Sequence, residues 1–248
     1  MKKGSTKETM ETDQLVITHL GDKPVKFYTR SKPGADITCS DEIVIREMFV
    51  ENVYGAFADD FKDTGVVVDI GANIGAFSIQ AAMLGAKKVY AIEPESDNFA
   101  ILKKNIEANG LQDIIKPINI AIGKEETTAM IGKMQGASSI TGLKPLVPEV
   151  TTDFGTEEVR VITLEKFLFD HKITYADFLK VDCEGSEYPI IAAATYDVLK
   201  KFKKLSMEYH CTDTETFGYM LARLSKVFNL RVFGDFEERG GQLYGDRY

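Results

Sequence analysis

One short stretch, Gly65 to Gly75 (GVVVDIGANIG), constrains the fold of this chain more than any other part of the sequence. Its valine run is apolar at consecutive positions, which is typical of a parallel strand covered by helices on both faces. A glycine-rich turn follows the strand, and an amphipathic segment that closes at Gly85 follows the turn. This succession predicts a ligand site, because glycines allow close approach to the backbone and free N–H groups at a helix start favour polar groups.

The spacing within this stretch indicates the kind of ligand. A dinucleotide fingerprint reads G-x-G-x-x-G and cradles a diphosphate, whereas this chain has Asp69 at the strand tip, followed by Gly71, Asn73 and Gly75. A carboxylate there repels a diphosphate and suits a cationic ligand. A second acid, Glu93, ends the next predicted strand, where it can accept hydrogen bonds from both hydroxyls of a ribose. A ligand with a ribose, an amino-acid end and a positive centre, but no diphosphate, is S-adenosylmethionine.

Four stretches carry a family resemblance. They read VVDIGANIGAFSI, VYAIEPESDNFAILKKNIEANGL, FLKVDCEGSEYPII and LSMEYH. Together they resemble the successive motifs of the FkbM family of S-adenosylmethionine-dependent methyltransferases, and the resemblance runs from about residue 40 to the end of the chain. It implies a Rossmann-like α/β fold with a seven-stranded methyltransferase sheet and helices on both faces. It also implies O-methylation of hydroxyl groups on sugars or polyketide-like natural products.

The chain divides into three parts by composition and pattern. Residues 1–12 are charged and rich in threonine, which predicts a disordered arm. Residues 13–63 predict a small N-terminal β/α extension, a hairpin and a covering helix, and residues 64–248 alternate strands and helices, as a parallel sheet requires. A β-rich insertion is predicted at 123–163. The last two strands are joined at Gly240-Gly241, and so short a link permits only antiparallel pairing, which predicts a reversed C-terminal β-hairpin.

Three details of this layout stay open or approximate. The predicted helix from about Asp41 to Tyr54 either packs over the sheet or forms a lid across the cofactor. The insertion is a candidate substrate cover, since recognition varies in loops on a rigid scaffold, or it is a passive connector. The third strand of the sheet is predicted at Ile118 to Ile122.

Cofactor-binding residues are expected beyond the carboxyl ends of the strands, where open parallel sheets bind ligands. The resemblance implies that the turn from Gly71 to Gly75 holds the amino-acid end, Glu93 the ribose, and the backbone from Asn119 to Ala121 the adenine. For Asp69, the alternative is a helix-capping acid. The full predicted set is Asp69, Gly71, Asn73, Gly75, Glu93, Pro94, Asn119, Ala121 and Asp182.

Catalytic residues are expected at the tips of two later strands. Asp182 and Glu184 are two apart, as are Glu208 and His210, and residues spaced by two on a strand share a face. On neighbouring strands, about 4.8 Å apart, all four groups would converge. Methyl transfer requires alignment of the nucleophile, and an alcohol also needs a base to take its proton. His210 is the first candidate for that base because its ordinary pKa is near neutrality, and Glu184 is the second.

The same cluster has two other interpretations. Asp182, Glu184 and Glu208 could hold Mg²⁺ or a similar cation, but nothing in their spacing fixes a ligand set, so no metal is predicted. Alternatively, Glu184 and Glu187 favour the start of the following helix, while His210 satisfies a buried carbonyl.

Charge and cysteine content bear on partners and location. A net charge of −8 argues against binding to phosphate backbones, so the expected partner is a small-molecule hydroxyl substrate, not a nucleic acid. No apolar run approaches a membrane span, and the polar N-terminus lacks the pattern of a signal peptide. The three cysteines show no C-x-x-C spacing, which favours reduced thiols and a cytoplasmic protein. The oligomeric state stays open.

Three rival functions remain at this point. An N-methyltransferase of the type with an Asn/Asp-Pro-Pro-Tyr motif is less favoured, because DCEGSEY follows the relevant strand. A non-catalytic sensor of S-adenosylmethionine is disfavoured by the predicted cluster of acids and imidazole. A nicotinamide-dependent dehydrogenase shares the general fold, and binding of NAD would distinguish it.

Overall fold

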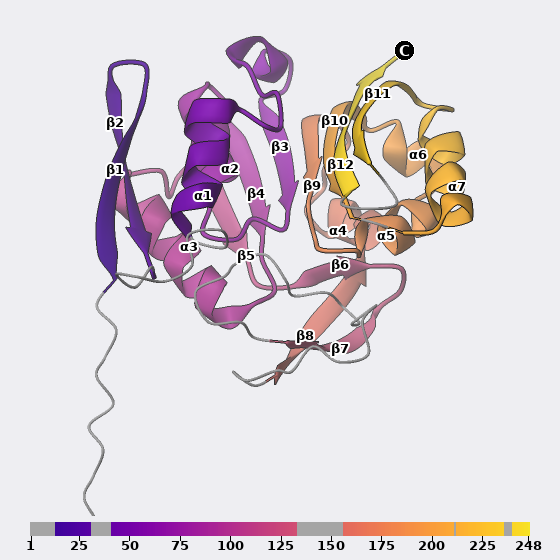
Figure 1. Cartoon of the computed structure of the whole chain (residues 1–248), viewed down its shortest axis with the longest axis horizontal. Helices are drawn as coiled ribbons and strands as arrows, with labels where there is room; N and C mark the ends of the chain where they lie inside the picture. Colours follow the sequence, from indigo (N-terminus) through magenta and orange to yellow (C-terminus); the bar gives the residue numbers. More distant parts are fainter. Residues whose placement is uncertain (1–12, 31–40, 133–155, 211, 236–239) are drawn as a thin grey trace, which may run out of the picture.

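The computed structural model describes residues 13–30, 41–132, 156–210, 212–235 and 240–248. Within them, a seven-stranded sheet has the order β11-β12-β10-β9-β3-β4-β5 (Figure 1). Its strands are β3 (Val66–Ile70), β4 (Lys88–Ile92), β5 (Ile115–Ile118), β9 (Ala176–Val181), β10 (Phe202–Tyr209), β11 (Phe228–Asp235) and β12 (Gly240–Arg247). The predicted fold class, a Rossmann-like methyltransferase sheet, is confirmed.

The direction of the last strands follows the prediction. β5, β4, β3, β9 and β10 run parallel, whereas β12 is antiparallel to both of its neighbours, β10 and β11. The register pairs Gly234 with Gly241 at the end of the hairpin. A β-carbon on Gly241 would lie 2.0 Å from the carbonyl oxygen of Phe233, so the close approach of the two strands requires glycine there.

Helices cover both faces of the sheet. α2 (Ala76–Met83) and α3 (Ser96–Ala108) pack on one face, and α4 (Leu164–Asp170), α5 (Glu187–Ala193), α6 (Tyr196–Leu199) and α7 (Thr214–Leu224) pack on the other. The valine run of β3 explains this arrangement: Val67 belongs to the core on the α2 side and Val68 to the core on the α5 side, and both are fully buried. Burial of each such side chain contributes about 1.5–3 kcal/mol.

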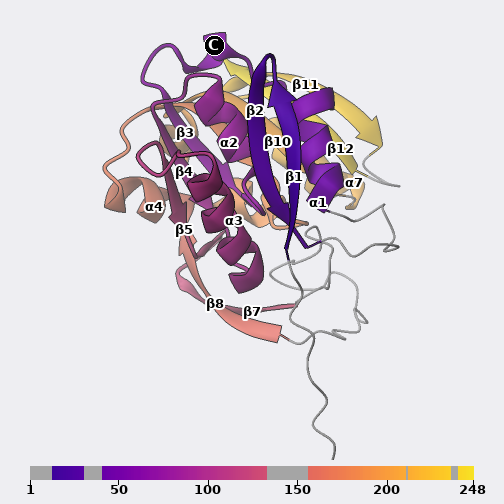
Figure 2. The same ribbon diagram turned by 90° about the vertical axis from the view of Figure 1, so that its left-hand side faces the viewer.

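The N-terminal extension is a hairpin followed by a short helical segment. β1 (Gln14–Leu20) and β2 (Lys23–Thr29) pair antiparallel, and the hairpin lies against α3, where Asn105 Oδ1 accepts a hydrogen bond from the backbone N–H of Tyr28 at 2.6 Å (Figure 2). α1 (Asp41–Arg46) continues into the π-helical turn η2 (Glu47–Glu51), and a 3-10 turn, η3 (Ala58–Phe61), follows. The helix therefore ends before Tyr54, because Asn52 adopts a left-handed conformation.

The insertion forms a small sheet of its own. β6 (Ala121–Gly123), β7 (Thr127–Gly132) and β8 (Thr156–Thr163) pair in the order β6-β8-β7, and both views place them beyond the carboxyl ends of β3 and β4 (Figures 1 and 2). The single strand predicted at Ile118 to Ile122 is wrong. The chain bends at Asn119, whose side-chain amide donates to the carbonyls of Glu93 and Pro94, so β5 and β6 belong to different sheets.

Some predictions fall where the structure gives no description. The disordered arm predicted at residues 1–12 lies outside the described residues, as does the middle of the insertion, residues 133–155. Cys183 is a free thiol, whereas Cys39 and Cys211 lie outside the described residues. No helix in the described part of the chain is long and apolar enough to cross a bilayer.

Candidate active site

The site is organised by the turn after β3. From β3 the chain builds β4 and β5 to one side and later returns to place β9 on the other side, so a crevice opens at the carboxyl ends of β3 and β9. The N–H of Gly71 donates to the carbonyl of Ile92, and the N–H of Asp182 donates to the carbonyl of Ile70, both at 3.0 Å. Gly71 has a φ of +78°, and a β-carbon on it would lie 1.6 Å from the carbonyl oxygen of Asp182. Only glycine fits this crossing.

Asp69 lies beneath this turn and is fully buried. Its carboxylate accepts a hydrogen bond of 2.6 Å from Ser78 Oγ and lies 3.3 Å from Lys180 Nζ. Burial raises the pKa of Asp69, against the opposing effect of Lys180. The carboxylate therefore does not face a ligand as a free group, and this geometry does not support the expected direct contact between Asp69 and a cationic ligand. Asp69 instead orients Lys180, which donates a hydrogen bond of 2.6 Å to the carbonyl of Gly71.

Lys180 lies between Asp69, beneath the glycine turn, and Asp182, at the end of β9. Its ammonium lies 3.4 Å from Asp182 Oδ2 and 5.1 Å from the centre of the Tyr54 ring. Burial alone lowers the pKa of Lys180, but the carboxylates of Asp69 and Asp182 outweigh it and raise the pKa above its ordinary value. Sequence reasoning missed this residue, although its spacing of two from Asp182 on a strand was a usable signal.

Glu93 lies at the end of β4, as predicted, and is almost fully buried. Its two oxygens accept hydrogen bonds from the backbone N–H of Asn73 at 2.8 Å and of Glu95 at 3.0 Å. Asn98 donates a further hydrogen bond to it. Burial raises the pKa of Glu93 to about 7 despite these donors. Glu93 thus stabilises the turn through its hydrogen bond with Asn73. Its binding to a ribose stays a prediction.

A pH dependence of stability follows from Glu93. Because its pKa is about 7 in the folded chain and 4.5 ordinarily, its contribution to stability is fully present below pH 4.5 and is lost as the pH rises through 7. In Glu93→Gln, the free energy of unfolding should no longer fall by about 3 kcal/mol as the pH rises from 4.5 to 7. Urea unfolding at several pH values measures it, and an unchanged pH slope in the variant would count against this ionisation.

A small open hollow lies beside the turn, at the carboxyl ends of β3 and β4. It is lined by Ile70, Gly71, Ile92, Pro94, Ile120, Ala121, Ile122, Cys183 and Ser186. Three predicted cofactor residues, Gly71, Pro94 and Ala121, therefore share one mostly apolar lining, which suits a flat nucleobase. Gly75 is also needed for packing, because a β-carbon on it would lie 2.6 Å from Leu102 Cδ1, and its contact with the cofactor stays a prediction.

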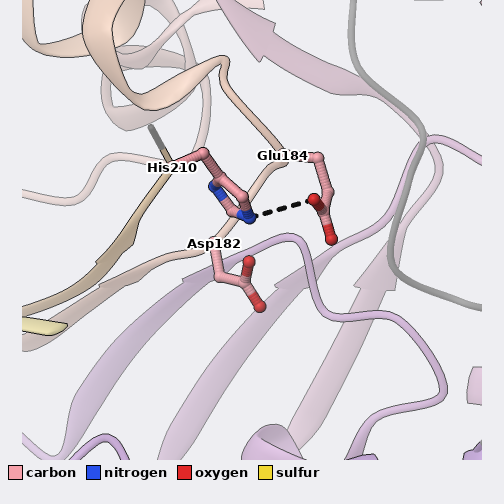
Figure 3. Close-up of side chains that lie close together, drawn as sticks. All are labelled: Asp182, Glu184 and His210. Carbon is pink, nitrogen blue, oxygen red and sulfur yellow. Dashed lines mark ion pairs between the residues drawn. The ribbon is translucent and has the colours of Figure 1, made fainter. Parts of the chain in front are cut away.

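The predicted convergence at the strand tips is present. β9 and β10 are neighbours, and Asp182, Glu184 and His210 lie together beyond them (Figure 3). Their nearest ligand atoms are all within 4.8 Å of one another. The reason differs in part from the one predicted, because Glu184 is not on a strand. It adopts a left-handed conformation, with φ of +52°, in the turn between β9 and α5.

His210 is held between two carboxylates. Its Nε2 lies 2.9 Å from Glu184, and its Nδ1 lies 3.1 Å from Glu187, a fully buried residue. Burial alone lowers the pKa of His210, but hydrogen bonds to Glu184 and Glu187 outweigh it and raise the pKa to about 11. The imidazole is thus protonated at neutral pH and cannot accept a proton, so the expectation that His210 is the base is corrected. The sequence analysis assigned Glu187 only to the start of a helix and did not predict that it pairs with His210.

Glu208 fits the role of base better. Burial, followed by the charge of Asp182, raises its pKa to about 7. Tyr54 lies beside it, with its hydroxyl 2.7 Å from Asp182 and 3.2 Å from Glu208. This tyrosine comes from the N-terminal extension, whose Met48 is buried and whose Val53 carbonyl accepts a hydrogen bond from Tyr244. The extension therefore covers the sheet and also supplies a side chain to the site.

Removal of the tyrosine hydroxyl should shift the pH dependence of turnover. A hydrogen bond donated to a carboxylate stabilises its ionised form, so Tyr54→Phe is expected to raise the pKa of Glu208 further and move the acid limb of the pH–rate profile upward by about one unit. Tyr196→Phe, at a partly exposed tyrosine on α6, is the matched control. Overlapping profiles for Tyr54→Phe and the wild type would contradict this role.

Comparisons with known proteins identify the family of this chain. A family model described as the methyltransferase FkbM domain matches residues 69–234. A ribosomal protein L11 methyltransferase from Geobacter sp. (strain M21) is 33% identical over 63 residues, 25% of this chain and 21% of that relative. The match thus spans about a fifth of the relative's length.

Solved structures are similar at the level of the fold. TrmK from M. capricolum in complex with S-adenosyl-homocysteine is 13% identical, with a TM-score of 0.46 over 79% of this chain and 66% of that chain. A proposed RNA methyltransferase from Pyrococcus horikoshii is 12% identical, with a TM-score of 0.39 over 73% and 74% of the two chains.

These comparisons correct the partner prediction. A small-molecule hydroxyl substrate with nucleic acid excluded was expected from the net charge of −8. That exclusion is wrong, because proteins that share the fold include one named as an RNA methyltransferase. The physical reason is that a net charge is a sum over the whole surface and does not describe the local patch that contacts a partner.

Proposed function

Because this chain belongs to the methyltransferase FkbM domain family, we propose that it transfers the methyl group of S-adenosylmethionine to a hydroxyl oxygen of its acceptor. The observation that carries this proposal is the position of Glu208, a carboxylate of pKa about 7, beside Asp182, whose backbone crosses the Gly71 turn. The candidate base and the candidate cofactor crevice are therefore adjacent.

The residues present fit this cofactor. The turn at Gly71 leaves backbone room that a β-carbon would fill, and the apolar hollow beside it suits the adenine. Glu93 would accept from the ribose once its hydrogen bond with the Asn73 N–H opens. S-adenosylmethionine, when bound, supplies a methyl group activated on a sulfonium.

The chain's own residues would then position and deprotonate the acceptor. Carboxylates only accept hydrogen bonds, so Asp182 and Glu184 would orient hydroxyl groups of a polyol at the cluster. Glu208, in its ionised form, would take the proton of the attacking hydroxyl, a role worth about 10²–10⁴-fold in rate. Tyr54 would hold Glu208 in place, and its own pKa is raised well above the ordinary value by burial and by Asp182.

The acceptor can be found by following the methyl group. Cell extract is incubated with the protein and S-adenosylmethionine labelled on its methyl group, then separated into small-molecule, RNA and protein fractions. We expect label in one fraction with the wild type and background label with Glu208→Gln. The labelled bond should behave as an ether on hydrolysis, whereas a methylamine product would replace O-methylation by N-methylation.

Two outcomes would overturn the proposal. If titration calorimetry shows binding of S-adenosylmethionine but no fraction is labelled, the protein is a sensor. If NAD binds at micromolar concentration and S-adenosylmethionine does not, the dehydrogenase interpretation holds instead.

A further inference from the structure

Three side chains at the tips of β9 and β10 present a mixed set of donor atoms. Asp182 and Glu184 each offer a carboxylate oxygen, and His210 offers Nε2 once an incoming ion displaces the proton there. These atoms lie within 4.8 Å of one another (Figure 3). All three are partly exposed, so an ion could reach them from solvent. The cation site considered from the sequence consisted of three carboxylates, Asp182, Glu184 and Glu208. In the structure His210 takes the third position, because Glu208 lies against the Tyr54 hydroxyl.

A buried carboxylate behind the imidazole is an independent observation. Glu187 is fully buried, its Oε1 lies 3.1 Å from His210 Nδ1, and its Oε2 has no hydrogen-bond partner among the described residues. A buried carboxylate with an unpaired oxygen is costly unless positive charge compensates it. Metal-binding histidines commonly donate their second ring N–H to such a carboxylate, which fixes the tautomer that leaves Nε2 free for the metal.

The surrounding charges also favour a cation. Glu208 adds a further carboxylate near Asp182, because the Tyr54 hydroxyl lies 2.7 Å from Asp182 and 3.2 Å from Glu208. Lys180 supplies one positive charge, and its ammonium is shared between the carboxylates of Asp69 and Asp182. The carboxylates thus outnumber the cationic side chains around the cluster.

From this geometry we propose that Asp182, Glu184 and His210 form a binding site for a divalent transition-metal ion, with Glu187 as the group that orients the imidazole. Two carboxylates and one imidazole form a donor set suited to Mn²⁺, Fe²⁺ or Zn²⁺, since Ca²⁺ and Mg²⁺ favour all-oxygen sites. The site does not depend on the acceptor. Its catalytic use rests on the proposed function: a hydroxyl that coordinates the ion has a lower pKa, which eases deprotonation by Glu208.

Manganese is a direct probe of this site. Chelator-treated protein is titrated with Mn²⁺, and the free ion is measured by electron paramagnetic resonance. We expect one bound ion per chain, with spin-echo modulation from a coordinated imidazole nitrogen. Glu184→Gln should weaken binding at least tenfold, His210→Gln should also abolish the nitrogen signal, and Glu187→Gln should weaken binding roughly 10–100-fold.

The matched control is His171→Gln, a histidine at the end of α4 that contacts Tyr90 and Phe167 and should leave Mn²⁺ binding unchanged. Thermal unfolding of each variant verifies folding, and Glu184→Gln, at a partly exposed turn, carries the test if His210→Gln does not fold. Binding that lacks the nitrogen signal and survives Glu184→Gln would overturn the site, as would no stoichiometric binding. Titration with S-adenosylmethionine in the same samples separates this result from failure of the proposed function.

Discussion

Replacement of Gly71 by alanine is expected to abolish measurable binding of S-adenosylmethionine and to lower the unfolding temperature by roughly 10 °C. The added β-carbon would lie 1.6 Å from the carbonyl oxygen of Asp182 and 2.8 Å from its carbonyl carbon. Both are backbone atoms held by the hydrogen bond from the Asp182 N–H to Ile70. Relief therefore requires β3 and β9 to separate at their ends, at a cost of about 4 kcal/mol or more.

Gly110→Ala provides the matched control for this substitution. Gly110 also has a positive φ, +66°, but a β-carbon there would meet no atom within 4 Å. Only the backbone strain remains, about 1 kcal/mol, and cofactor binding should be unchanged. Calorimetry and thermal unfolding of the two variants separate the clash from the strain. Equal effects at Gly71 and Gly110 would show that the close crossing of β3 and β9 is not the cause.

Replacement of Glu208 by glutamine is expected to lower kcat by about 10²–10⁴-fold while the affinity for S-adenosylmethionine stays unchanged. Glutamine keeps the shape of the side chain and its contact with the Tyr54 hydroxyl but cannot accept a proton. The pKa of Glu208 is about 7, and the base works in its ionised form. The wild-type rate should therefore rise with pH through about 7 and then level off. Initial rates of methyl transfer across this range measure the effect, and the rising limb should disappear in the variant.

The control for this prediction is Glu165→Gln, at an exposed glutamate in the first turn of α4, which should leave the pH–rate profile intact. Wild-type turnover in Glu208→Gln would remove Glu208 from the mechanism. The next candidate would be Glu184, whose pKa is also raised by burial, against the opposing hydrogen bond from His210.

Much of the fold could be predicted because local patterns determine it. A continuous valine run indicates a strand buried on both faces, and Val67 and Val68 are indeed buried in opposite layers. The antiparallel pair predicted at the end of the chain is formed by β11 and β12, although Gly240 and Gly241 belong to β12 itself. The strand predicted at Ile118 to Ile122 failed because the bend at Asn119 depends on carbonyls of Glu93 and Pro94, which lie far away in the sequence.

By itself, the sequence indicated that Asp182, Glu184 and His210 meet, because their spacing places them at the ends of two strands expected to be neighbours. Only the tertiary structure decided what those residues can do, because a pKa depends on burial and on charges brought in by other elements. Lys180 turned Asp69 from a ligand-facing acid into part of an ion pair. Glu184 and Glu187 hold His210 in its cationic form. Tyr54 contacts Asp182 and Glu208, although it precedes both by more than a hundred residues in the sequence.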